Sequence, residues 1–430
     1  MASLEFRRAL AIAVLGVVTL AGGLGLLATS LSADTDRPAT AADVSSVGPT
    51  VSTLHDAGAT GENVTVGVLD VTGFDTSSAI LDGRVADARA FAPGESVPND
   101  GNNAHGTETA ETVARVAPSA GLHLATFDSL EGYRRAVEWL VAEDADVIVA
   151  PVSFYGMTGD GTSAVADVAE RATRKGVVFV SPAGNLGQSH WTGRYRRVEN
   201  GTLAFEEGTR NYLRNGGRDV TVWLSWDDAH HSEDYTARLY WTDGSESRLV
   251  ARSHPYSGDG VPNERIVARV QSGTYYVTVE GPANATGARL RLSSPTHDFQ
   301  HVEPAGSIVA PASDPAVLAV GAYDSDAEQV APFSSRGPTP DGRDGIDLLA
   351  PSNPAVVDAG HFGGTSASTA YVGGVAALVR DRRPELSPRG VERRLETTAV
   401  EAGDPGPDSV AGHGLLRPLR AVGVERNATT

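Results

Sequence analysis

The chain has 430 residues, no cysteine and a formal net charge of −19 at pH 7. A chain of this length can bury a large hydrophobic core without disulfide bonds or a structural metal ion. The missing cysteine excludes a disulfide framework, a thiolate metal site and a cysteine nucleophile. The acidic balance argues against nucleic acid or an anionic membrane surface as the main partner.

The cationic residues are almost all arginine. Lys175 is the only lysine among 35 cationic residues, which face 54 acidic ones. This acidic, arginine-rich composition resembles that of proteins from salt-loving archaea. A GC-rich genome also favours arginine codons, so the composition leaves both explanations open.

An apolar segment lies at the N-terminus. Arg7 and Arg8 precede an uncharged run over residues 9–31, which can cross a bilayer at about 20 residues per crossing. Residues 1–33 therefore fit a membrane anchor or a signal peptide. A cleavable signal usually has a shorter apolar region of roughly 7 to 15 residues, which favours the anchor. The basic side stays in the cytoplasm, which places the rest of the chain outside the cytoplasm, anchored or secreted.

Apolar strands and amphipathic helices alternate in two stretches that follow a linker predicted over residues 34–50. Strands are expected at residues 64–69, 146–150, 176–180 and 316–320, and helices at 132–142, 164–174, 366–380 and 387–396. This alternation predicts a doubly wound α/β domain with a mainly parallel sheet and helices on both faces. Its two parts span residues 51–190 and 303–422, and residues 423–430 form a tail.

The hydrophobic period changes between these two parts. Apolar and polar residues alternate near residues 222–226, 237–241, 266–270, 275–279 and 288–292. This period of two indicates half-buried strands, and the glycine-containing turns between them are typical of a β-sandwich. We therefore expect an all-β sandwich domain over residues 191–302, inserted into the α/β domain.

Three chemically reactive side chains stand at the ends of predicted elements. Asp70 ends a strand, His105 precedes a helix within Ala-His-Gly-Thr, and Ser366 begins another helix within Gly-Gly-Thr-Ser. Functional groups collect at the carboxyl ends of strands in doubly wound folds, so these residues can form a Ser-His-Asp triad. Serine becomes an effective nucleophile only when an imidazole accepts its proton and a carboxylate fixes the imidazole tautomer. Taken singly, each residue also fits an ordinary role as a turn aspartate, a histidine or a helix cap.

The order and context of these residues resemble the subtilisin-like serine peptidases, the subtilase or S8 family. The matching stretches are the strand that ends at Asp70, the His105-Gly-Thr segment, and residues 181–185, 332–339, 347–351 and 363–378. The resemblance covers residues 50–190 and 305–420. It implies a serine endopeptidase of haloarchaeal type, in which Ser366 is the nucleophile, His105 the general base and Asp70 its orienting carboxylate, and Asn185 supplies the oxyanion-hole amide.

The same resemblance implies polypeptide substrates that bind as an extended strand along a cleft. Ser153, Phe154, Tyr155 and Gly156 would form the specificity pocket, unless they only pack the end of their strand. No cofactor and no metal are implied, because the loop that many relatives insert after the histidine to bind calcium is absent. A monomer is expected, and residues 273–279 resemble a prepeptidase C-terminal-type domain of secreted bacterial peptidases.

The turn after Asp70 departs from the family pattern, and the role of two acidic pairs is left open. The stretch Asp70-Val-Thr-Gly73 has one extra residue before its glycine, which allows a bulge or a redirected carboxylate. Asp75 is the rival carboxylate, although it follows no strand. The acidic pairs at 227–228 and 233–234 fit either a Ca²⁺ site or a solvated acidic face.

The alternative function is a catalytically impaired pseudopeptidase that binds a surface protein or glycan through the β-sandwich.

Overall fold

The computed structural model describes residues 47–92, 97, 103–198, 201–256, 260–354 and 362–424. The predicted anchor over residues 1–33 lies outside this part of the chain, as do most of the predicted linker and tail. Helix α2 (Val47–Asp56) begins within the range predicted as linker. Among the described residues, no helix combines the length and apolar character needed to span a membrane.

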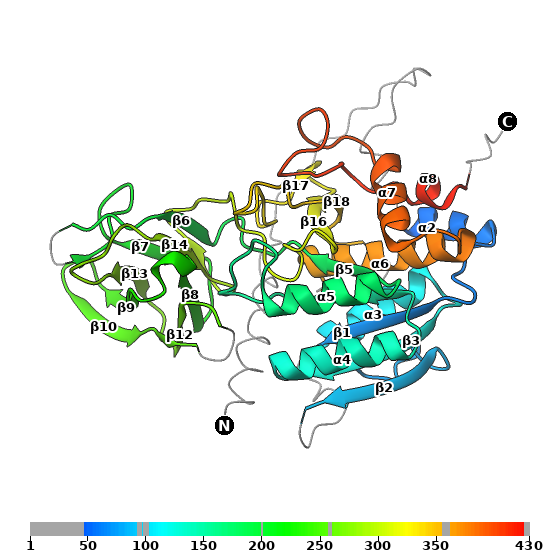
Figure 1. Ribbon diagram of the computed structural model, residues 1–430, viewed down its shortest axis with the longest axis horizontal. Coiled ribbons are helices and arrows are strands. Elements are labelled where there is room, and N and C mark those ends of the chain that lie inside the picture. Colours follow the sequence, from blue (N-terminus) through cyan, green and yellow to red (C-terminus); the bar gives the residue numbers. More distant parts are fainter. Residues whose placement is uncertain are drawn as a thin grey trace.

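An eight-stranded sheet forms the centre of the α/β unit (Figure 1). The strand order is β17-β16-β5-β4-β1-β3-β2, β18 pairs with β16, and only β17 runs antiparallel to its neighbour. The strands are β1 (Thr65–Asp70), β2 (Val85–Phe91), β3 (Gly121–Phe127), β4 (Val147–Val149), β5 (Val178–Pro182), β16 (Leu318–Asp324), β17 (Gln329–Val330) and β18 (Leu348–Pro351). The mixed α/β fold with a parallel sheet is therefore confirmed.

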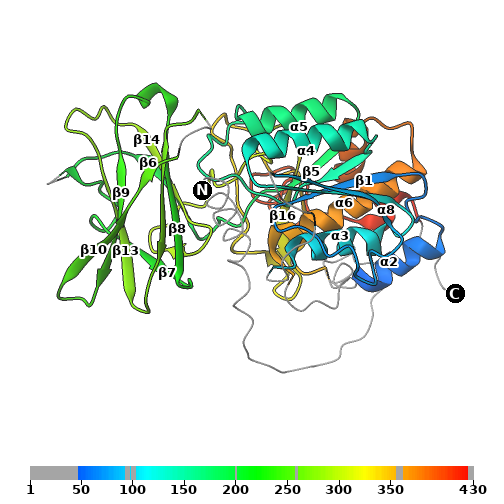
Figure 2. The same ribbon diagram turned by 90° about the horizontal axis from the view of Figure 1, so that it is seen from below.

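Helices cover both faces of this sheet (Figure 2). Helices α4 (Leu130–Ala142) and α5 (Ala164–Arg174) pack on one face, and α3 (His105–Val116) and α6 (Gly364–Arg382) on the other. Helices α7 (Pro388–Thr398) and α8 (Pro418–Val422) pack against α6. Side chains alternate along each strand: Val68 of β1 joins the core under α3 and α6, whereas Leu69 joins the core under α4.

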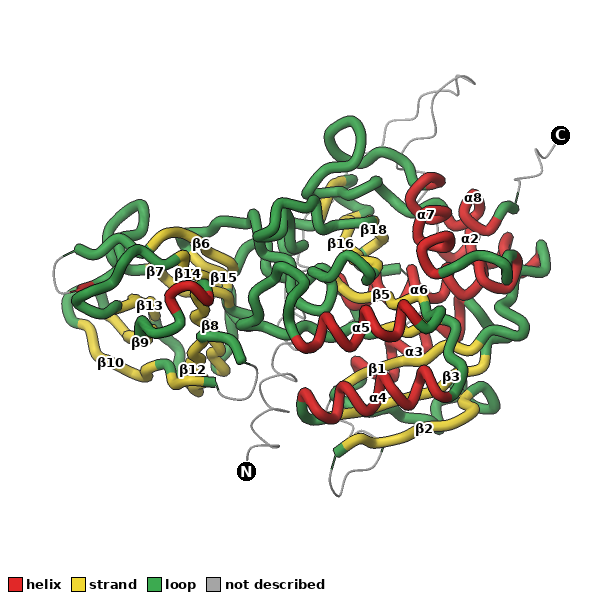
Figure 3. Tube along the Cα trace, in the orientation of Figure 1, coloured by secondary structure: helices red, strands yellow, loops and turns green. Residues whose placement is uncertain are grey.

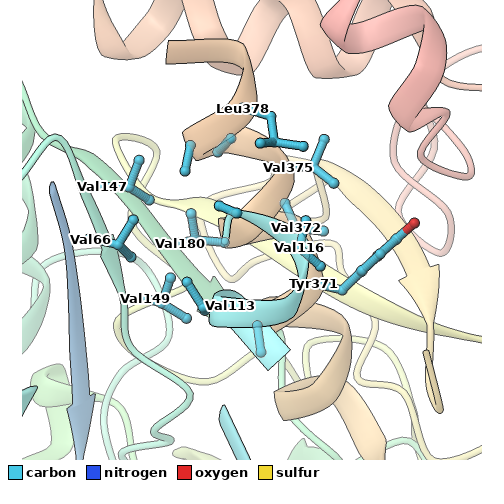
Figure 4. Close-up of a cluster of buried hydrophobic side chains, with 14 of the residues drawn as sticks. Val66, Val113, Val116, Val147, Val149, Val180, Tyr371, Val372, Val375 and Leu378 are labelled. Atoms are coloured by element: carbon cyan, nitrogen blue, oxygen red, sulfur yellow. The ribbon is translucent and has the colours of Figure 1, made fainter. Parts of the chain in front are cut away.

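Helix α6 runs through the core, where its apolar side chains lie among valines of β1, β4, β5 and α3 (Figure 4). Two adjacent glycines permit this close packing. A Cβ atom added at Gly373 would lie 2.3 Å from Val149, and one at Gly374 would lie 2.6 Å from Val116. The Gly-Gly pair in the sequence therefore brings α6 against both the sheet and α3, and this packing fixes where the helix begins.

Between β5 and β16 the chain forms two five-stranded antiparallel sheets, which we call the two-sheet unit (residues 190–299). One sheet contains β10 (Ser247–Arg252), β9 (Thr236–Thr242), β13 (Thr274–Glu280), β7 (Asn211–Arg214) and β15 (Asp298–Phe299). The other contains β11 (His254–Pro255), β12 (Asn263–Arg269), β8 (Asp219–Trp226), β14 (Arg289–Ser293) and β6 (His190–Arg194). A separate hydrophobic core joins the sheets. The α-helices of the described residues, α2 to α8, lie in the α/β unit, whereas η3 (Asp228–His230) is a short 3₁₀ turn of the two-sheet unit (Figure 3).

A partly buried cluster of carboxylates joins α7 to the start of β18. Oxygens of Asp347, Glu392 and Glu396 lie within 4.8 Å of one another. Burial raises the pKa of Asp347 well above its usual range, and burial raises the pKa of Glu392 to about 7 although Arg389 opposes this shift. His413 Nε2 lies 3.8 Å from Glu396 Oε2, so one imidazole and one guanidinium face the three acids.

Glu392→Gln is expected to raise the melting temperature at pH 7.5 but not at pH 4.5. The folded protein holds the Glu392 proton up to about pH 7, whereas the unfolded chain releases it near its ordinary value of 4.5. The free energy of unfolding contributed by this group is therefore fully present below pH 4.5 and is lost as the pH rises toward 7. Thermal melts of wild type, Glu392→Gln and the exposed control Glu385→Gln between pH 4.5 and 8 test this. Equal melting curves for wild type and Glu392→Gln at every pH would contradict it.

Candidate active site

The Asp70 carboxylate and the His105 imidazole form a buried contact at the carboxyl edge of the sheet. Asp70 is the last residue of β1, and His105 is the first residue of α3. His105 Nδ1 lies 2.6 Å from Asp70 Oδ2, and the two residues are 7% and 0% exposed. This contact fixes the imidazole by Nδ1 and leaves its Nε2 as the atom that can exchange a proton.

Thr72 holds the Asp70 carboxylate in this orientation. Its backbone N–H and its hydroxyl both donate to Asp70 Oδ1, at 2.8 and 2.7 Å. The same hydroxyl accepts a hydrogen bond of 2.9 Å from Gly106 N. A Cβ at Gly106 would lie 2.3 Å from Gly73 O, so only glycine allows α3 to approach the turn this closely. The extra residue in this turn therefore leaves the carboxylate aimed at His105.

The rival carboxylate lies elsewhere. Asp75 is exposed, and its Oδ1 accepts hydrogen bonds from Ser77 N at 3.0 Å and Ser77 Oγ at 2.7 Å. These contacts are those of a local Asx turn. Asp70, and not Asp75, is the partner of His105.

Thr72→Ala is expected to lower kcat about tenfold with little change in KM. A hydrogen bond to a charged group contributes about 1.5–3 kcal/mol, and about 1.4 kcal/mol of lost transition-state stabilisation corresponds to a tenfold change in rate. Thr72→Ser keeps the hydroxyl and should restore most of kcat. Steady-state kinetics of the three proteins test this. A Thr72→Ala protein with a lower melting temperature and an unchanged kcat would show that Thr72 is only structural.

Asn185 is joined to the first turn of α6. Its Oδ1 accepts hydrogen bonds from Thr365 N at 3.1 Å and Thr365 Oγ1 at 2.9 Å. Because the carboxamide oxygen is engaged in this way, the amide group Nδ2 is the free donor, and no described residue accepts a hydrogen bond from it. Asn185 and Ser366 are both partly exposed, so this donor and the hydroxyl next to Thr365 can reach a bound substrate.

The turn that carries Asn185 is braced by the Ser-Ser pair of the stretch 332–339. Ser335 N donates to Gly184 O at 2.9 Å, and Leu186 N donates to Ser335 Oγ at 3.1 Å. Gly184 has a positive φ of 113°, and a Cβ there would lie 2.8 Å from Ser335 Oγ. Positive φ is a conformation that glycine adopts without strain. This brace explains why the two stretches occur in the same sequence.

Ser366 lies in the first turn of α6, where the backbone N–H groups have no partner within the helix. The ring of Phe362, just before this helix, contacts the His105 ring edge-on at 5.6 Å between centroids. Ser368 Oγ donates to Ala350 O and Pro351 O, both at 3.0 Å, which ties α6 to the end of β18. The starts of α3 and α6 and the end of β1 are thus brought together, and Ser366 lies at the positive end of α6.

The predicted substrate segment follows β4 and has two faces. Phe154 is buried in the α4 core, with ring contacts to Tyr133 at 5.0 Å and Phe127 at 6.3 Å. Its side chain therefore packs the strand end, and only its backbone can contact a substrate. Tyr155 packs on the opposite side, in a cluster with Leu186. Phe154 N donates to Ala310 O at 2.9 Å, so part of this edge is already paired within the protein.

The acidic pairs of the two-sheet unit are engaged in local contacts. Asp227 pairs with His230 and accepts a hydrogen bond from Arg289 N at 2.6 Å. Glu233 Oε1 accepts hydrogen bonds from Thr286 N at 2.9 Å and Thr286 Oγ1 at 2.6 Å. These carboxylates brace loops of the unit.

Sequence reasoning did not assign Thr72, Thr365 or Phe362 to the site. A threonine two residues after a strand-end aspartate is a recognisable turn signal, and it could have identified Thr72. Thr365 and Phe362 stand beside Ser366 in the sequence, but their contacts with Asn185 and His105 depend on the tertiary fold.

Comparison with known proteins identifies relatives of this chain. The sequence pattern of the Subtilase family matches residues 61–214 and 258–414. Subtilisin E of Bacillus subtilis (strain 168) is 34% identical over 151 residues, which cover 32% of this chain and 38% of that protein. Mycosin-1 of Mycolicibacterium smegmatis is 33% identical over 168 residues, which cover 34% of this chain and 37% of that protein. The matched region therefore spans well under half the length of these relatives.

Solved structures show the same fold over nearly the whole chain. The CspB protease of Clostridium perfringens superposes with a TM-score of 0.64 at 19% identity and covers 90% of this chain and 98% of that chain. A lanthipeptide protease superposes with a TM-score of 0.51 at 16% identity and covers 87% and 93%. At these identities the likeness concerns the fold. Because the family pattern matches well over half of the residues, the chain belongs to the subtilase family.

Proposed function

We propose that the protein is a serine endopeptidase that cleaves polypeptides through an acyl-enzyme on Ser366. His105 Nε2 accepts the proton of the Ser366 hydroxyl as the oxygen attacks the substrate carbonyl carbon, and Asp70 stabilises the imidazolium. Asn185 Nδ2 and the free N–H of Ser366 donate to the carbonyl oxygen as it becomes an oxyanion. The imidazolium then protonates the leaving amine, and water hydrolyses the ester in the second half of the reaction.

The observation that carries this proposal is the 2.6 Å contact between His105 Nδ1 and Asp70 Oδ2. Asn185 supports it, because Thr365 holds its carboxamide oxygen and leaves its NH₂ group as the available donor. A pseudopeptidase would not need a carboxylate held by two hydrogen bonds, an oriented imidazole and an oriented amide. The endopeptidase is therefore the function that we favour over a binding module.

Hydrolysis of an unfolded polypeptide by the purified full chain tests the proposal. We expect the protein to cut denatured casein at internal bonds, and a fluorophosphonate added beforehand to abolish the cleavage. The metal chelator EDTA should leave the cleavage unchanged, which separates the reaction from that of a contaminating metallopeptidase. A folded preparation that leaves casein intact would contradict the proposal.

We further propose that the two-sheet unit is an inserted β-sandwich domain and that the peptidase works outside the cytoplasm, held by its apolar N-terminal segment. The sheet arrangement and the separate core support the first statement. The apolar run over residues 9–31 supports the second. The excess of 54 acidic over 35 basic residues fits a protein that works at high salt, since salt screens their mutual repulsion.

A further inference from the structure

The side chain of Tyr155 packs against the segment that carries the proposed oxyanion donor. Phe154 points into the α4 core, and neighbouring residues of an extended segment point to opposite sides. Tyr155 accordingly packs with Leu186 and Val309 and is 7% exposed. Leu186 directly follows Asn185 in the chain, so Tyr155 contacts the segment that carries the proposed oxyanion donor.

Little free volume remains in one cavity that Tyr155 lines. The cavity bounded by the segments 154–157, 306–310 and Leu186 has a volume of about 10 Å³. A single water molecule requires about 10–15 Å³ of such volume, so no larger group fits without movement of the protein. Burial raises the pKa of Tyr155 to about 12, although a hydrogen bond with Ser153 opposes the shift.

The two-sheet unit closes the far side of this space. Trp223 of β8 belongs to the same cluster and is 6% exposed, and a Cβ added at Gly156 would lie 2.7 Å from its ring. Asn263 Nδ2 of β12 donates to Gly156 O at 3.3 Å, and Arg291 Nη1 of β14 donates to Met157 O at 3.1 Å. Three strands of one sheet therefore hold the segment in place, so Tyr155 cannot move outward without displacing Trp223.

We infer that Tyr155, backed by Trp223 of the two-sheet unit, limits the residue on the acyl side of the scissile bond to glycine or alanine. The inference rests on the proposed function, because it assumes that Asn185 binds the carbonyl oxygen of that residue. The family resemblance places the adjoining side chain at residues 153–156, where the Tyr155 ring packs against Leu186 and Val309. A large side chain would overlap that ring, and overpacking of this kind is unfavourable in a well-packed protein.

Tetrapeptide p-nitroanilides that end in alanine or phenylalanine test the inference with the full chain. Wild type should prefer the alanine substrate by at least about tenfold in kcat/KM, the lower end of the discrimination expected for side chains that differ by a methylene or more. Tyr155→Gly should reduce this ratio by about tenfold or more, because it opens the pocket. Trp223→Ala should reduce it in the same direction, and it serves as the second test if Tyr155→Gly does not fold. The control is Trp241→Ala, which removes a tryptophan from the other sheet. Trp241 packs on the core of the two-sheet unit and lies under Arg248. This variant should leave the ratio of the two kcat/KM values unchanged.

The outcomes separate this inference from the proposed function. If fluorophosphonate-sensitive hydrolysis of neither anilide is seen, the proposed function fails. The role of Tyr155 is refuted if wild type hydrolyses both anilides with similar kcat/KM, or if neither folded variant changes the ratio. In both cases the proposed peptidase function is retained.

Discussion

Asp70→Asn should lower kcat by about 10⁴, the size of effect seen when the triad aspartate of another serine peptidase is replaced in this way. Thr72 donates two hydrogen bonds to Asp70 Oδ1, so the asparagine must present its carbonyl oxygen to Thr72. Its NH₂ group then faces His105 Nδ1, where the carboxylate oxygen stood. An imidazole that accepts a hydrogen bond at Nδ1 carries its proton on Nε2, and this tautomer cannot accept the proton of Ser366.

The exposed carboxylate of Asp75 supplies the matched control. Asp75→Asn removes a charge from the same loop and should leave kcat within about twofold of wild type, as is usual for an exposed site. Circular dichroism and melting curves show whether each variant is folded, and kcat is measured with an alanine p-nitroanilide. A large loss of kcat in Asp75→Asn together with an active Asp70→Asn would exchange the roles of the two residues.

Asn185→Ala is expected to lower kcat by about 10² to 10³, a magnitude transferred from the loss of one oxyanion-hole donor in a subtilisin. The amide stabilises charge that develops only in the transition state, so KM should change little. The substitution also removes the acceptor of two Thr365 hydrogen bonds at the start of α6. Loss of a side-chain acceptor at a helix start costs about 1 kcal/mol of stability, so the melting temperature should fall as well.

A second variant separates these two effects. Asn185→Asp keeps an oxygen for Thr365 but has no amide donor, and its negative charge repels the oxyanion. We expect its melting temperature to stay near that of wild type while kcat falls at least as far as in Asn185→Ala. If Asn185→Asp keeps its stability and also keeps kcat within a few-fold of wild type, the oxyanion hole lies elsewhere and Asn185 only caps the helix.

The local sequence was sufficient to locate a strand where neighbouring residues form a continuous apolar run. Continuous apolar runs located β1, β4, β5 and β16, because strands buried on both faces need such runs. Strands β2 and β3 were not predicted. β2 lies at the edge of the sheet, and six of its seven residues are exposed or partly exposed. β3 contains His123 among its apolar residues, so neither strand has the sequence of a buried strand.

The details of the site depend on contacts between distant residues. The approach of His105 to Asp70 was anticipated from the family resemblance, but the effect of the extra residue in the turn could not be read from the sequence. It depends on Gly106, which lets α3 come close enough for its N–H to reach the Thr72 hydroxyl. Trp223 of the two-sheet unit likewise packs against Gly156 of the α/β unit. No local sequence pattern predicts how these two units are placed relative to each other.

The most direct test of the account is to locate the serine that reacts with a fluorophosphonate in the folded full chain. Peptide mass spectrometry after labelling should place the phosphonyl group on Ser366. His105→Ala should strongly reduce this labelling, because the hydroxyl then has no base, whereas the control Ser325→Ala should label like wild type. Label on a different serine, or a folded wild-type protein that stays unlabelled, would contradict the assignment of Ser366 as the activated nucleophile.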